Sequence, residues 1–123
     1  MNAMMKAQRA YSTAAAPTRT AKDVEYDALA RITHKIRSSA LKGPESYGTL
    51  VRALHDNRKL WDIFATEVSD ANNPLPSDLK ARLFYLAEFT RHHTSRVLAK
   101  QETVDALVEV NTSVLRGLRG GNT

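Results

Sequence analysis

Imidazole can bind a metal or transfer a proton near neutral pH, so the histidines are the first candidates for chemistry. The chain has four of them, His34, His55, His92 and His93. His92 and His93 are adjacent, and on a helix neighbouring side chains point about 100° apart. No two histidines are four residues apart, and no HExxH sequence occurs. The sequence therefore predicts no metal site and no cofactor.

Carboxylate pairs are the other candidates for acid–base chemistry. Glu67 and Asp70 are three residues apart, and Asp105 and Glu109 are four apart. On a helix surface such pairs usually face water, and a solvated carboxylate has too low a pKa to act as an acid at neutral pH. Cysteine is absent, and so are the phosphate-binding glycine loops and the GxSxG turn. We therefore expect a protein that is not an enzyme.

Two asparagines stand within apolar helical stripes. Asn57 precedes Trp61, the only tryptophan, by one helical turn, and Asn111 interrupts a stripe of valines and leucines. Burying an unpaired amide costs about 1–3 kcal/mol, so each asparagine needs a partner. The partner is either another helix, whose register the hydrogen bond fixes, or a bound protein. We expect Trp61 to anchor the core, whereas an exposed tryptophan would indicate a binding hot spot.

Apolar residues recur at helical spacing, and the second of the resulting helices holds both Asn57 and Trp61. Thr20 and Asp23 resemble a capping box before the first helix, which Gly43-Pro44 ends. The second helix follows, and its polar stretch 55–58 is compatible with a bend or a break. Residues 72–76 form the clearest loop in the sequence, because two X-Pro steps favour extended backbone.

Two further helices complete the prediction. Ser77 is expected to be the N-cap of the third, and Thr103 is expected to cap the fourth. No stretch alternates apolar and polar residues as a β-strand would. We predict an all-α chain that forms a small antiparallel bundle of four to five helices.

Composition and charge limit the partners. The chain has 123 residues, 42% of them hydrophobic, and a net charge of +5. Residues 1–22 hold four basic and no acidic residues, whereas residues 23–115 are close to neutral. A neutral body argues against a nucleic-acid partner, and no apolar run approaches the roughly 18 residues that span a bilayer. The N-terminus has the composition of a transit peptide or of a helical lead-in; we expect a retained segment of a cytoplasmic protein.

Several short motifs resemble those of a known family. They are Ala53-Leu54, Asn57-Arg58-Lys59-Leu60-Trp61, Asn73-Pro74-Leu75-Pro76 and Leu86-Ala87-Glu88-Phe89. In this order they resemble the FlaF family of bacterial flagellar biosynthesis regulators. Tyr11 with its Ala/Thr-rich stretch resembles the family's opening, and Asn111 followed by Gly117-Leu118 resembles its ending. Lys22-Asp23 departs from the Arg-Glu-like pair expected there.

The resemblance implies a small helical protein needed for flagellin production. It implies flagellin as the partner, bound in the cytoplasm as by a chaperone, and a functional link to FlbT, a repressor of flagellin translation. The alternative is direct action on flagellin mRNA through the basic N-terminus. The oligomeric state stays open.

We expect the chain to divide into a basic Ala-rich lead-in over residues 1–18, helical or flexible, a single FlaF-like helical domain over 19–118 and a flexible tail over 119–123. Leu107 represents the apolar stripe of the last helix, which we expect to contribute most to flagellin binding if part of it faces a groove. The candidate structural or partner-binding residues are Asn57, Leu60, Trp61, Asn73, Leu75, Pro76, Leu107 and Asn111.

Overall fold

The computed structural model describes the backbone of residues 21–120 and the side chains of residues 24–117. Within these residues every regular element is a helix, which confirms the all-α prediction. The lead-in over 1–18 and the Thr20–Asp23 capping box lie outside the described side chains, and α5 includes the first two residues of the tail over 119–123. The elements are α2 (Ala21–Lys42), the 3-10 helix η1 (Pro44–Ser46), α3 (Tyr47–Ser69), α4 (Ser77–Leu98) and α5 (Asp105–Gly120).

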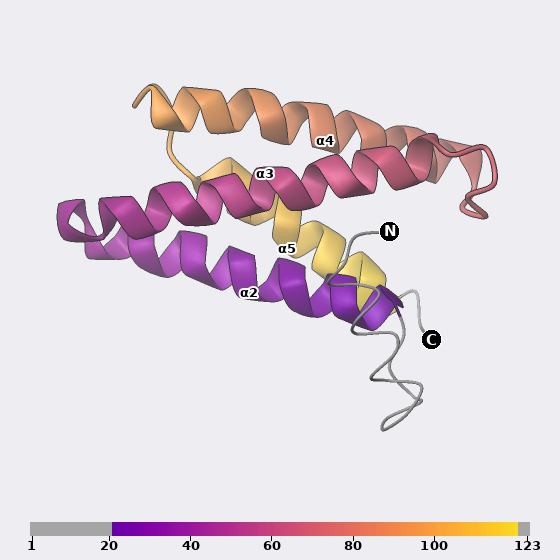
Figure 1. Ribbon diagram of the computed structural model, residues 1–123, viewed down its shortest axis with the longest axis horizontal. Helices are drawn as coiled ribbons and strands as arrows, with labels where there is room; N and C mark the ends of the chain where they lie inside the picture. Colours follow the sequence, from indigo (N-terminus) through magenta and orange to yellow (C-terminus); the bar gives the residue numbers. More distant parts are fainter. Residues whose placement is uncertain (1–20, 121–123) are drawn as a thin grey trace.

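The long helices α2, α3 and α4 lie side by side, with α3 in the middle and each antiparallel to the next (Figure 1). The last helix, α5, slants from the C-terminal end of α4 towards the N-terminal part of α2. It packs mainly on α2 and much less on α4. No helix within the described residues is long and apolar enough to cross a membrane.

The core consists of two clusters of buried side chains. One joins the C-terminal half of α2 to the starts of α3 and α5, through Ile36, Ala53, Leu54, Val104 and Leu107. The other joins the N-terminal half of α2 to α3 and α4, through Leu29, Trp61, Phe64 and Ala87. The rings of Trp61 and Phe64 meet edge to face, with centroids 5.2 Å apart. Leu107 has no exposed surface, so the apolar stripe of α5 packs inward there.

Two residues with positive φ shape the connections. Gly43, at φ 87°, ends α2 in the left-handed region, which glycine adopts without steric cost. Lys100, at φ 61°, ends α4 in the same region. There the Gln101 N–H donates to the Arg96 carbonyl at 2.9 Å, and the Lys100 N–H donates to the Val97 carbonyl at 3.0 Å. This is a Schellman motif with lysine in the place where glycine is usual.

Two of the predicted helix details need correction. Ser77 is not the N-cap of α4: Pro76 holds that position, and Ser77 is the first helical residue. The N-cap side chain makes no capping hydrogen bond, and the Asp78 carboxylate accepts from the Leu79 N–H in the first turn at 3.0 Å. The helix α3 runs unbroken through residues 55–58, because Asn57 faces the core while the polar side chains before it face water.

At the start of α5 the N-cap position belongs to Val104, whose carbonyl accepts from the Val108 N–H, and the predicted cap Thr103 lies one residue earlier. The Thr103 hydroxyl accepts a hydrogen bond from the Asp105 N–H at 3.3 Å, which satisfies one of the backbone donors that a helix start leaves free. The connection between α3 and α4 spans residues 70–76 and includes the predicted loop over 72–76.

Candidate functional site

The two asparagines that the sequence places in apolar stripes meet in the middle of the bundle. The Asn111 Nδ2 donates to the Asn57 Oδ1 at 2.8 Å and to the Thr33 hydroxyl at 3.0 Å. The Trp61 Nε1 donates to the Asn111 Oδ1 at 2.9 Å. All four side chains are buried. This group of four residues, which we call the Asn111 cluster, joins α2, α3 and α5 through one side-chain amide.

Most of the polar atoms of the Asn111 cluster have partners. The Thr33 hydroxyl, which accepts from Asn111, donates to the Leu29 carbonyl at 2.6 Å. Within the described residues, the Asn57 Nδ2 and the Thr90 hydroxyl are buried without a hydrogen-bond partner. Each satisfied hydrogen bond contributes about 0.5–1.5 kcal/mol of net stability. The arrangement fixes the register of three helices, and its burial leaves it no surface for a bound protein.

The candidates in the α3–α4 loop lie in a different part of the fold. The Asn73 Nδ2 donates to the Glu67 carbonyl at the end of α3, and the Asn73 Oδ1 accepts from the Leu75 N–H, both at 3.0 Å. Leu75 is partly exposed, and Pro76 is exposed at the N-cap of α4. Asn73 therefore holds the loop in shape, and Leu75 and Pro76 lie at the surface.

The two remaining candidates pack inward. Leu60 is half-buried against the cluster around Leu29 and Trp61. Leu107 is fully buried in the other cluster. Leu60 keeps part of its side chain exposed, whereas Leu107 offers no free surface and contacts no partner as long as α5 stays packed on α2.

An open apolar hollow lies at the end of the bundle where α2 ends and α3 begins. It has a volume of about 810 Å³, and large apolar side chains are exposed around it: Leu41 at 81% and Tyr47 at 44%. We call it the end hollow, and its lining residues are Ser39, Ala40, Leu41, Gly43, Pro44, Tyr47, Leu50, Val97, Lys100, Glu102, Thr103, Val104 and Asp105.

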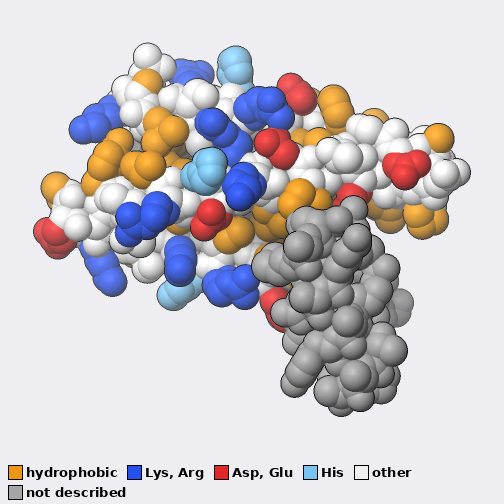
Figure 2. Space-filling view, viewed as in Figure 1, with side chains coloured by type: hydrophobic (Ala, Val, Ile, Leu, Met, Phe, Trp, Pro, Cys, Tyr) orange, Lys and Arg blue, Asp and Glu red, His pale blue; other side chains and the backbone are white. Residues whose placement is uncertain are grey.

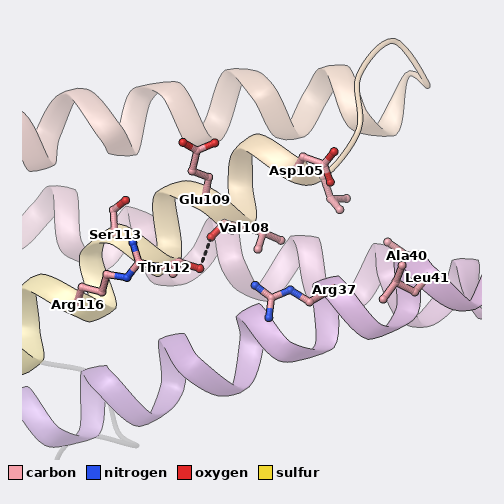
Figure 3. Close-up of a pocket in the computed structure, with 10 residues that line it drawn as sticks. Arg37, Ala40, Leu41, Asp105, Val108, Glu109, Thr112, Ser113 and Arg116 are labelled. Carbon is pink, nitrogen blue, oxygen red and sulfur yellow. Dashed lines mark hydrogen bonds between the residues drawn. The ribbon is translucent and has the colours of Figure 1, made fainter.

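A smaller groove continues from the end hollow between α2 and α5 (Figure 3). Its volume is about 330 Å³, and we call it the α2–α5 groove. The two hollows share Ala40, Leu41, Val104 and Asp105, so they form one continuous surface. Nothing in the predicted helices and motifs indicates this surface directly. The available signal was Leu41, which is apolar but lies off the buried stripe of α2, just before the glycine that ends the helix.

Two of the titratable side chains have specific surroundings, His93 and Glu25. The His93 Nε2 lies 3.0 Å from the Thr103 carbonyl, and its ring stacks on Phe89. His93 therefore links α4 to the connection before α5. Among the described residues no group of histidines and carboxylates could hold a metal ion.

One carboxyl group is strongly perturbed. Glu25 on α2 is half-buried, and burial, together with a hydrogen bond to Glu67 on α3 and the charge of Glu67, raises the pKa of Glu25 to about 8. Two carboxyl groups side by side cannot both ionise cheaply, so one of them keeps its proton.

The surface elsewhere is mixed. Figure 2 shows one face of the molecule, where basic and acidic side chains are interspersed and hydrophobic ones gather in small groups between them. On this face the described side chains form no continuous basic stripe of the kind typical of nucleic-acid binding.

These features define a small all-α bundle with a buried polar cluster that positions its helices and an open apolar surface at one end. The chain belongs to the FlaF family: the family model described as flagellar protein FlaF matches residues 7–118. The match confirms the resemblance read from the motifs, and the family is named for a flagellar protein and not for an enzyme. Comparisons with curated proteins and with solved structures gave no match.

Proposed function

We propose that this protein acts in flagellum biogenesis by binding flagellin in the cytoplasm as a chaperone, and so supports flagellin synthesis and export. The observation that carries the proposal is membership of a flagellar protein family across nearly the whole chain. In this proposal the protein also counteracts FlbT, the repressor of flagellin translation, and binds neither a cofactor nor nucleic acid.

The surface of the bundle supports a binding role. Large apolar side chains are exposed around the end hollow, where they cost solubility unless a partner covers them. The side chains of the Asn111 cluster are buried and hold the helices in place, so the surface can be rigid before a partner arrives. A rigid apolar surface binds with less loss of conformational entropy than a flexible one.

Calorimetry of the full-length protein with monomeric flagellin tests the proposal. We expect a complex with a negative heat-capacity change, because apolar surface is buried. Raising the salt concentration from ~50 to ~200 mM should change the affinity only slightly, because apolar contacts are not screened. The matched measurement uses the leader RNA of the flagellin message under the same conditions.

Two results would contradict the proposal. One is the absence of any complex with flagellin. The other is tight binding to the leader RNA that weakens steeply with salt, which would favour direct action on the message through the basic N-terminus.

A further inference from the structure

The end hollow differs from an ordinary surface depression in how much of its apolar lining faces water. Leu41, on the last turn of α2, is 81% exposed, and Tyr47, on the first turn of α3, is 44% exposed. The floor consists of Leu50, Val97 and Val104. Val104 belongs to the core cluster around Ile36 and Leu107, and half-buried Leu50 and Val97 pack against that cluster. The volume of about 810 Å³ lies within the range of about 300–1,000 Å³ that is typical of ligand sites. Several side chains of a partner fit into such a space.

The charges around the end hollow are asymmetric. Glu102 and Asp105 line it on the side of α5, and Glu109 continues this acidic edge along the α2–α5 groove. Across the part of the chain that the structure describes, none of these three carboxylates makes an ion pair. The one cation in the lining is Lys100, whose ammonium group lies over the Tyr47 ring, 5.5 Å from the centroid. The α5 side is therefore an acidic edge beside an apolar floor.

The wall on the side of α2 has the opposite character. Arg37 lines the α2–α5 groove from α2, and Figure 3 shows it across from α5, which carries Asp105 and Glu109 on the side of the end hollow and Arg116 at the far end of the groove. In the part next to the end hollow, an occupant is therefore favoured with its basic residues towards α5.

The fold also limits the shape of the occupant. Residues 21–120 contain no β-strand, so no sheet edge is available to pair with an extended peptide. A partner segment that enters the end hollow must satisfy its own backbone hydrogen bonds, which an α-helix does. The continuity of the end hollow with the α2–α5 groove gives such a helix room to lie along the surface.

We propose that the end hollow and the α2–α5 groove together form the docking surface for an amphipathic α-helix that carries lysine or arginine along one edge of its apolar stripe. The apolar stripe covers Leu41 and Tyr47, and the basic edge faces Glu102, Asp105 and Glu109. This inference goes beyond the proposed function, because it names the surface and the chemistry of the partner and does not require that the partner be flagellin.

Two fluorescently labelled synthetic peptides test the docking surface by anisotropy with the full-length protein. They share one leucine and alanine stripe and differ in one edge, which is lysine in the first and glutamate in the second. We expect the lysine-edge peptide to bind at least about tenfold more tightly, which corresponds to ~1.4 kcal/mol. Glu102→Lys should reduce this preference.

Leu41→Ser and Tyr85→Ser are the matched variants. Both side chains are largely exposed, at 81% and 66%, so neither change should disturb the fold, which circular dichroism would check. Tyr85 lies on α4 and lines neither hollow. We expect Leu41→Ser to weaken binding of the lysine-edge peptide about tenfold and Tyr85→Ser to leave it unchanged.

Three results would overturn the inference: equal affinity for the two peptides, equal effects of Leu41→Ser and Tyr85→Ser, or a dimer of the wild-type protein that Leu41→Ser dissociates. The last would show that a second copy covers the surface. Monomeric flagellin serves as a further ligand. If it fails to bind while the lysine-edge peptide binds at Leu41, the docking surface is supported and the proposed function is contradicted. If flagellin binds and both peptides fail, the proposed function stands and the docking surface is overturned.

Discussion

The Asn111 amide nitrogen donates to the Asn57 amide oxygen at 2.8 Å, across 54 residues of sequence. Both side chains have no exposed surface. Each asparagine alone would destabilise an apolar stripe, and the bond between them satisfies the Asn57 oxygen, although the Asn57 Nδ2 stays without a partner. The pair, with Trp61 and Thr33, is the point at which α2, α3 and α5 are held in one register.

Replacing Asn111 should destabilise the protein strongly. Asn111→Ala leaves the Trp61 Nε1 and the Asn57 Oδ1 without this partner, and an unsatisfied buried group costs about 1–3 kcal/mol. We expect the free energy of unfolding in urea to fall by roughly 3 kcal/mol or more. Ser113→Ala, at an exposed position of the same helix, is the control and should change it by less than about 0.5 kcal/mol. Equal midpoints for the two variants would rule out a stabilising role for the Asn111 cluster.

The hydrogen bond and the bulk of Trp61 can be separated. Trp61→Ala removes a large buried side chain and should cost about 3–5 kcal/mol. Trp61→Phe keeps an aromatic ring beside Phe64 but removes the donor to Asn111, so it should cost about 1–3 kcal/mol. A double-mutant cycle of Trp61→Phe with Asn111→Ala measures their interaction, expected at about 0.5–3 kcal/mol. Strict additivity of the two changes would show that the bond contributes nothing.

Lys100 occupies a position where glycine is expected to be more stable. Its φ of 61° places a side chain in the left-handed region, at a cost of roughly 1–2 kcal/mol for a residue with a Cβ. Lys100→Gly removes that cost but also the contact with the Tyr47 ring, so Lys100→Ala is the matched control. We expect Lys100→Gly to be about 1 kcal/mol more stable than Lys100→Ala in thermal unfolding. The reverse order would show that this turn is not strained.

Glu25 should make stability depend on pH. Its pKa is raised from 4.5 to about 8 in the folded protein, so the folded state binds more protons than the unfolded state between these values. The free energy of unfolding contributed by this group is therefore fully present below pH 4.5, falls as the pH rises, and is lost by about pH 8. Glu25→Gln stays neutral and should show a flatter curve between these limits. Parallel curves for the two proteins in urea titrations at each pH would contradict the prediction.

Much of the fold could be predicted from the sequence, because it depends on local patterns. Gly43-Pro44 ends a helix by backbone geometry alone, and the loop over 72–76 follows from its prolines. The N-cap of α4 could not be placed to the residue, because Pro76 and Ser77 are both compatible with a helix start. The polar stretch 55–58 was ambiguous, since only the packing of α3 shows that Asn57 faces inward.

The candidate site was predictable only in part. The sequence indicates that Asn57 and Asn111 need partners, but spacing along the chain does not indicate that they are each other's partner. It also marks Leu107 as apolar without showing which helix covers it. The end hollow was out of reach, because the exposure of Leu41 depends on which elements leave that surface uncovered.

The position of Asn111 in the last helix has a consequence for synthesis. The ribosome releases α2, α3 and α4 before α5, so Thr33, Asn57 and Trp61 are made before the residue that joins them. Until α5 arrives, the nascent chain exposes Ile36 and Leu54, which pack against Leu107, to water. Such partly folded chains are prone to aggregation and to degradation. Translation must therefore reach the last helix before the bundle can close, and a prematurely terminated chain lacks the side chain that completes it.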